Sequence, residues 1–235
     1  MFSLSSNTLH YLPANDQVRN QKPGGQNHRL TWEGSPRLRV AFCAIVFLMM
    51  PAMLSSQQAQ WMYKIARDGK QIGWMKLQKT DSANRMMLSL NSEVKTRFVF
   101  DIAIDVTDLA TFEEGKLVHS ATIRRTNNRT KLDKQTRRLG TKYEISQEGK
   151  TRLQSFPVIH ANLLSMYFFE PAGLQEIYSD MHERFIPVKR IKDGSYEVKF
   201  PDGNSNVFFY AGGLCTRIKI KHSFYTAEIL LNTKG

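Results

Sequence analysis

Apolar and polar side chains alternate along most of the chain after residue 60. Between Met86 and Val106, nine of the eleven even-numbered positions are apolar, and every charged residue stands at an odd-numbered position. A period of two predicts strands with one buried face. Because most strands have about 3–10 residues, this stretch predicts either one long, strongly bent strand or two strands joined by a bulge near residues 96–101.

Three later runs alternate in the same way. The side chains predicted to point inward are Tyr196, Val198 and Phe200 in the first run, Leu214, Ile218 and Ile220 in the second, and Tyr225, Ala227, Ile229 and Leu231 in the third. Charged residues such as Glu197 and Lys219 occupy the alternate positions. Each of these runs therefore predicts a strand that is buried on one face only.

Tight-turn signals separate the alternating runs. They are RDGK (67–70), EEGK (113–116), QEGK (147–150), KDGS (192–195), PDGN (201–204) and AGG (211–213). Pairs that end in glycine supply the positive φ that short hairpin loops require. The pattern predicts an all-β protein, an antiparallel meander of roughly ten strands. A single sheet of that size must curl, so we expect a curved half-barrel or open barrel.

One apolar segment, HANLLSMYFFEP (160–171), does not alternate. Ile159, Leu163, Met166 and Tyr167 share one face at helical spacing, and Pro157 and Pro171 stand near its ends. Proline is tolerated in the first turn of a helix and stops one at its end. The segment therefore predicts a short helix at about 158–168. Since it is apolar nearly all round, we expect it in or over the concave face of the sheet.

The N-terminal part is predicted to be an export signal rather than part of the fold. Arg37 and Arg39 precede an apolar run from Val40 to Met50, and small and polar residues follow. This order is typical of a signal peptide, here residues 36–59, although an uncleaved anchor or a core segment has the same composition. The polar residues 1–35 are interpreted as a disordered leader or a start assigned too far upstream. The expected single β-rich domain is 60–235, in a periplasmic or secreted location.

The chain has 235 residues with a formal net charge of +12, which suits contact with acidic partners. Seven basic residues lie between positions 124 and 138 around a single aspartate: Arg124, Arg125, Arg129, Lys131, Lys134, Arg137 and Arg138. This run contains no aromatic side chain for base stacking, so nucleic acid is not a predicted partner. The run predicts either a solvated hairpin tip or a contact with an anionic membrane surface.

No motif for a metal, a cofactor or a catalytic residue is present. His119, His160, His182 and His222 are far apart and have no metal-ligand spacing. Ser165 is expected to bond back to a helix carbonyl, and Cys215 is expected to be a buried thiol. The carboxylates at 170, 176, 180 and 183 are a weaker candidate for an acid–base pair, and a solvated loop with a carboxylate at a helix end is the preferred interpretation.

Six segments carry a resemblance to a known family. In chain order they are YKIARDGKQIGWMKL, SEVKTRFVF, FEEGKLVHS, SMYFFEP, IYSD and YEVKFPDGNSNVFFYAGGL. Together they resemble an uncharacterised family of exported envelope proteins from Bacteroidetes-type Gram-negative bacteria, which is known as a domain of unknown function. The resemblance covers about residues 61–231. It implies a signal peptide, one β-rich domain and a location in the cell envelope, and it supplies no catalytic residues.

These observations favour an exported, non-enzymatic binding protein that holds an apolar, lipid-like ligand in a curved sheet. The residues predicted to line the ligand site are Leu163, Leu164, Met166, Tyr167, Phe168, Phe98 and Phe100. The alternative is a structural or interaction module of the envelope whose concavity is filled by its own side chains. A carboxylate-based hydrolase is the third hypothesis.

Overall fold

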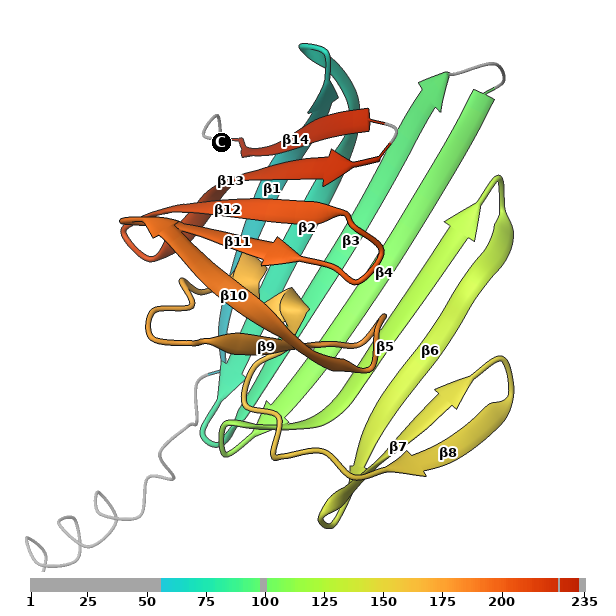
Figure 1. Ribbon diagram of the computed structural model, residues 1–235, viewed down its shortest axis with the longest axis vertical. Helices are drawn as coiled ribbons and strands as arrows, with labels where there is room; N and C mark the ends of the chain where they lie inside the picture. The colour runs from blue at the N-terminus through green and yellow to red at the C-terminus, as the bar shows by residue number, and fades with distance from the viewer. Residues whose placement is uncertain (1–55, 98–100, 224, 233–235) are drawn as a thin grey trace, which may run out of the picture. The chain divides into compact units, whose positions relative to one another are not determined.

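The computed structural model describes residues 56–97, 101–223 and 225–232, which form a single antiparallel sheet of fourteen strands (Figure 1). The strands are β1 (Gln57–Arg67), β2 (Lys70–Ser82), β3 (Arg85–Arg97), β4 (Asp101–Glu113), β5 (Lys116–Thr126), β6 (Arg129–Leu139), β7 (Lys142–Gln147), β8 (Lys150–Gln154), β9 (Glu176–Ser179), β10 (Arg184–Lys192), β11 (Ser195–Lys199), β12 (Ser205–Ala211), β13 (Leu214–His222) and β14 (Tyr225–Leu231). The predicted all-β antiparallel class is confirmed. The predicted export signal lies outside the described residues.

Strand order follows the chain, apart from one long-range junction. β1 pairs with β14, so the sheet runs from β8 through β1 and β14 to β9. The six predicted tight turns each join consecutive strands. At the first of them, Asp68 and Gly69 have φ values of 48° and 75°, which is the left-handed geometry of a two-residue hairpin loop. β8 and β9 remain the two edges, so the barrel is open, as predicted.

The interpretation of Met86–Val106 as one bent strand, or as two strands joined by a bulge, is wrong. The stretch contains β3 and the beginning of β4, which run antiparallel in register from Arg97↔Asp101 to Arg85↔Glu113. In this register, even-numbered positions pair with even-numbered positions, and both sets face the same side. The alternation therefore continues unbroken through a reversal of chain direction, and periodicity by itself does not detect that reversal.

The later runs mostly face as predicted. Val198 in β11 and Ile229 in β14 are buried. In β13 the buried pair is Cys215 and Ile218, whereas Leu214, which was expected to point inward, is only half-buried. The register between β12 and β13 shifts between Phe209 and Tyr210. A bulge adds one residue to one strand and reverses its parity from that point on, which explains the difference at Leu214.

The predicted helix at 158–168 is too long. The structure has a five-residue 3-10 helix, η1 (Leu163–Tyr167), which is capped by Asn162. The residues before it are extended because the rest of the protein engages their peptide groups. The Leu117 amide donates to the Ile159 carbonyl at 2.8 Å, and the Tyr143 hydroxyl accepts from the Ile159 amide at 3.0 Å. Among the described residues, no helix is long and apolar enough to cross a bilayer.

The hydrophobic core lies between the two halves of the sheet, which are β1 to β8 and β9 to β14. Strands β9 to β13 cross in front of β2 to β4, and η1 lies between these layers (Figure 1). η1 contacts β3 and β4 on one side and β9 and β13 on the other. Core side chains come from both halves, for example Leu77 and Leu88 from the first and Val198 and Phe208 from the second. The sheet therefore folds back onto one apolar face, with η1 inside it.

Candidate functional site

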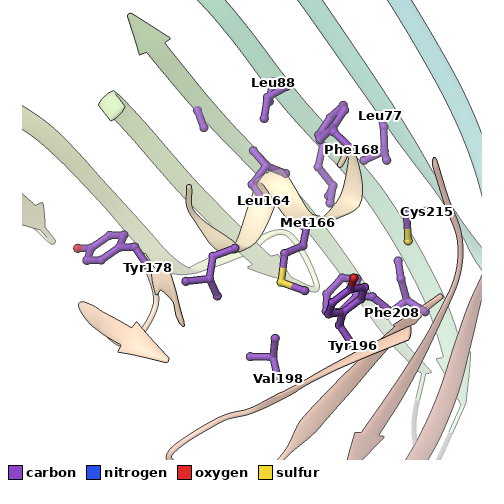
Figure 2. Packing of buried hydrophobic residues seen from close by; sticks show 14 of the residues in the cluster. Leu77, Leu88, Leu164, Met166, Phe168, Tyr178, Tyr196, Val198, Phe208 and Cys215 are labelled. Atoms are coloured by element: carbon purple, nitrogen blue, oxygen red, sulfur yellow. The ribbon is translucent and has the colours of Figure 1, made fainter. Parts of the chain in front are cut away.

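The predicted ligand-lining residues of η1 belong to the packed core. Leu164, Met166 and Phe168 are 5%, 1% and 4% exposed, and Leu163 and Tyr167 pack partly buried against the same cluster. Figure 2 shows Leu164, Met166 and Phe168 among side chains from both layers of the sheet. The other two predicted residues, Phe98 and Phe100, lie outside the described residues. The five described side chains therefore serve as packing groups in this structure.

Directed contacts fix η1 in this position. The Tyr210 hydroxyl donates to the Met166 carbonyl at 2.5 Å. Phe168 packs edge-on against Trp61, and Tyr167 packs edge-on against Phe208, with ring centroids 5.9 and 5.4 Å apart. Aromatic pairs of this kind are worth about 0.5–1.5 kcal/mol each beyond the burial of their area. The η1 segment is therefore held by specific contacts with both halves of the sheet.

Local hydrogen bonds position the start of η1. The Asn162 side chain accepts from the Ser165 amide at 3.3 Å, and the Ser165 hydroxyl donates to the Asn162 carbonyl at 2.6 Å. The prediction that Ser165 bonds back to a carbonyl is thus confirmed. The same Asn162 side chain donates to Asp180 at 2.8 Å. Asn162 therefore links η1 to the turn between β9 and β10.

That turn carries a group of polar side chains, which we name the polar clasp. It consists of Asn162, Asp180 and Glu183, together with Ser120, Lys134 and Arg152 from β5, β6 and β8. The Ser120 hydroxyl donates to Asp180, and Lys134 donates to Glu183 at 2.7 Å and to the Met181 carbonyl at 3.0 Å. Arg152 contacts the second oxygen of Glu183. The clasp joins the strands next to one edge of the sheet to the turn beside the other edge.

Burial controls the acidity of the clasp carboxylates. Burial raises the pKa of Asp180, although hydrogen bonds from Ser120 and Asn162 oppose this change. Burial also acts to raise the pKa of Glu183, but hydrogen bonds and charges from Lys134 and Arg152 outweigh it and leave this pKa below its usual value. Glu183 is therefore the charged partner of the clasp. Asp180 is held mainly through hydrogen bonds.

Asp108 on β4 lies next to the clasp and lacks a full set of partners. Burial raises its pKa to about 6; a hydrogen bond with Thr122 opposes this change, and the negative charge of Asp180 adds a smaller increase. Its Oδ1 atom is buried and has no hydrogen-bond partner among the described residues. A buried carboxylate oxygen without a donor costs free energy when the group is charged. Ionisation of Asp108 therefore costs folding free energy at neutral pH.

The carboxylates grouped in the sequence at 170–183 do not converge on one site. Glu170 accepts from the Tyr196 hydroxyl at 2.8 Å, and Glu176 is exposed at the beginning of β9. Only Asp180 and Glu183 share the clasp, and there they are bound to donors on β5, β6 and β8. His182 contacts the Ser179 hydroxyl at 3.0 Å and stacks on Phe200. Asp108, which lies next to Asp180 in the fold, was not grouped with these carboxylates because it lies far away in the chain.

The basic run from 124 to 138 forms the hairpin of β5 and β6. Its turn is at Asn127 and Asn128, and most of its cations are exposed: Arg124, Arg125, Arg129, Lys131 and Arg137, with Arg138 half-buried. Lys134 is the exception, since it is 5% exposed and paired with Glu183. Its predicted role in a surface contact is therefore wrong. The reason is that even-numbered positions of β6 face the interior.

Two further candidates for chemistry are the cysteine thiol and the metal-ligating side chains. Cys215 is buried, and burial raises its pKa to about 12, so it is not a nucleophile at neutral pH. No group of three or more metal-ligating side chains occurs in the described part of the chain. The fold and these contacts define an all-β domain with a packed interior and a polar clasp across its open seam.

The chain belongs to the DUF6134 family, a domain of unknown function, which matches residues 63–232. Among curated proteins, none matches the chain. A solved structure described as a beta-barrel-like protein of domain of unknown function DUF1849, from Brucella abortus, is similar with a TM-score of 0.49 at 10% identity. The match covers 76% of this chain and 96% of that one. The predicted resemblance to a family of unknown function is confirmed at that level.

Proposed function

We propose that this protein is an exported, non-enzymatic module of a Gram-negative cell envelope that acts through contacts with partners. The observation that carries the proposal is the packing of η1. Leu164, Met166 and Phe168 fill the space between the two layers of the sheet, where an apolar ligand was predicted to bind. Interiors packed in this way contain few voids larger than a water molecule. The filled-core alternative is therefore favoured over the apolar-ligand hypothesis.

Native mass spectrometry distinguishes the two hypotheses. The full chain is purified in mild detergent, transferred to volatile buffer and titrated with palmitic acid. We expect no adduct on the wild-type protein. The Met166→Ala variant serves as the matched control, because it removes a fully buried side chain of η1 and leaves a cavity. A stoichiometric acyl adduct on the wild-type protein would contradict the filled core and establish the apolar-ligand hypothesis.

Export is the second part of the proposal, and it is supported by the signal-like order of residues 36–59. Periplasmic and cytoplasmic fractions of cells that express the full chain provide the test. We expect the processed protein in the periplasmic fraction. An Ile45→Asp variant interrupts the apolar run and should accumulate unprocessed in the cytoplasm. Equal cytoplasmic retention of wild type and variant would count against export.

The proposed partners include an anionic membrane surface at the β5–β6 hairpin. Arg124, Arg125, Arg129 and Lys131 are exposed around its turn. Each basic residue close to an anionic surface contributes about 1 kcal/mol to binding. Lys134 is not part of this surface, because it is buried in the polar clasp.

A further inference from the structure

The first and last strands of the chain, β1 and β14, pair over only part of their length. We name the gap between them, beyond the end of their ladder, the β1–β14 fork. The β1–β14 ladder runs from Tyr63↔Leu231 to Ala66↔Glu228 and contains no later pair. Beyond Ala66, β1 leads into the tight turn with β2, whereas β14 continues to pair with β13 as far as Tyr225. The peptide groups of β14 beyond Glu228 that face β1 therefore have no ladder partner on that strand.

This fork contains a cavity of about 440 Å³. Its walls come from both hairpins and are mainly polar: Lys64, Ala66, Asp68, Gly69, Gln71, Lys219, Thr226, Ala227, Glu228 and Leu230. Small-molecule sites typically have volumes of about 300–1,000 Å³. The cavity lies away from η1 and from the polar clasp, since it shares no lining residue with either.

The charge in the fork is positive. Lys64 and Lys219 make no ion pair with any described residue, so both ammonium groups are available to a ligand. Glu228 is engaged by Arg217 at 2.5 Å, and the mostly exposed Asp68 contacts the preceding arginine at 3.5 Å. Both acidic groups of the lining are thus paired with arginines that do not line the cavity. Lys64 and Lys219 are therefore the cations of the cavity lining that have no acidic partner among the described residues.

A cation–π contact spans the far end of the fork. The guanidinium of Arg67 on β1 lies 5.9 Å from the ring centroid of Tyr225 on β14, and this ring stacks on His222. Contacts of this type are worth about 0.5–1 kcal/mol at exposed sites. The contact therefore links β1 to β14 beyond the end of their ladder.

We propose that the β1–β14 fork binds the phosphate monoester group of a small hydroxylated molecule. Lysine ammonium groups are compact cations that recognise phosphate as point charges. Lys64 on β1 and Lys219 on β13 contribute two such charges from the two strands that flank β14, while Gln71 and Thr226 offer side chains that can bond to hydroxyl groups. The phosphate comes either from a soluble ester or from the headgroup of a lipid, and the shared chemistry is the dianionic monoester.

Calorimetric titration of the full chain with glycerol 3-phosphate tests the soluble source. We expect saturable binding at low salt and no binding of glycerol, which lacks the charge. The Lys64→Gln/Lys219→Gln variant should weaken binding about tenfold or more, because charge-assisted hydrogen bonds are lost. A Lys189→Gln/Lys192→Gln variant removes the same charge from exposed positions of β10 and should bind like the wild type.

Vesicles containing phosphatidic acid test the lipid source with the same three proteins. Binding that is lost in the Lys64→Gln/Lys219→Gln variant and kept in the β10 variant assigns the headgroup to the fork. Ala66→Leu provides a second variant, since it fills the cavity without changing the charge; it should abolish binding while the circular dichroism spectrum stays unchanged. The proposal is overturned if neither probe binds, or if both lysine pairs weaken binding equally.

Discussion

Asp108 places a buried carboxylate oxygen in the interior without a hydrogen-bond donor. Burial raises its pKa to about 6, and the pKa of its neighbour Asp180 is also raised by burial. A carboxyl group whose pKa is higher in the folded state stabilises the fold at pH values below its unfolded pKa. This stabilisation is lost as the pH rises through the folded-state pKa. Both residues therefore make the protein less stable at neutral pH than at about pH 4–5.

The Asp108→Asn variant removes this penalty. We expect its free energy of unfolding at about pH 7.5 to exceed that of the wild type by about 1–2 kcal/mol. Between about pH 5 and 7.5, its stability should fall less steeply than that of the wild type. Urea unfolding at several pH values measures both effects. Asp133→Asn, an exposed substitution on β6, is the control, and an identical pH profile for wild type and Asp108→Asn would refute the assignment.

At the scale of elements, η1 is a short segment that is stabilised by the packing of its buried side chains. A five-residue 3-10 helix has little intrinsic stability, so η1 persists because Leu164, Met166 and Phe168 are packed on both sides. Its place in the sequence was predicted from the absence of alternation. Its length was not, because tertiary hydrogen bonds to Ile159 and Ala161 keep the preceding residues extended.

Met166→Ala measures this packing. Removal of a fully buried methionine side chain should lower the free energy of unfolding by about 2–5 kcal/mol, because a cavity remains. Met181→Ala is the matched control, since Met181 is 43% exposed and should change stability by no more than about 0.5 kcal/mol. Thermal and urea unfolding of both variants provide the comparison. Equal losses in the two variants would show that η1 is not packed in solution.

The β5–β6 hairpin is the second element with a separate role. Replacing Arg124, Arg125, Arg129 and Lys131 together by glutamine should abolish most cosedimentation with phosphatidylglycerol vesicles, because about 1 kcal/mol of attraction per residue is removed. Replacing the four exposed lysines at 142, 150, 189 and 192 removes the same formal charge elsewhere. If both sets reduce binding equally, net charge rather than the hairpin drives the contact.

At the scale of the whole domain, the polar clasp takes the place of a closing ladder. β8 and β9 are the two edges of the sheet, and they do not pair with one another. Ser120, Lys134 and Arg152 instead bind the β9–β10 turn through side chains. A barrel closed by a ladder has no free edge. Here the gap between the two edges is bridged by two ion pairs and by hydrogen bonds, which respond to pH and to substitution.

Glu183→Gln tests the clasp. We expect a loss of about 2–4 kcal/mol in the free energy of unfolding, because Lys134 would stay buried without its charged partner. The Lys134→Met/Glu183→Leu double variant should recover part of this loss, since apolar residues of similar volume often replace buried ion pairs at little cost. Glu176→Gln, an exposed change on β9, is the control. Additive losses in the double variant would exclude the pairing.

The sequence by itself determined the β-strand character of the chain, most of the predicted inward faces and six of the turns, although it predicted roughly ten strands where the described residues form fourteen. These features depend on neighbours a few residues apart: alternation reports burial of one face, and pairs such as Asp68–Gly69 specify a turn through their backbone angles. The inward parity of Val198 and Ile229 was predicted correctly for this reason. The same local character explains the two wrong predictions, at Met86–Val106 and at Leu214. A chain reversal between β3 and β4 and a bulge between β12 and β13 do not change the alternation of apolar and polar residues in the sequence.

Only the tertiary structure decided which side chains meet across the sheet. Asp108, Lys134 and Asp180 are separated by long stretches of chain, and the folded sheet alone brings them into one region. Lys134 looked like part of a solvated basic run until its parity on β6 placed it inside. Whether the concavity is filled or open likewise depends on the fit of η1 between two layers. Contacts of this kind are set by packing in three dimensions, which no local pattern encodes.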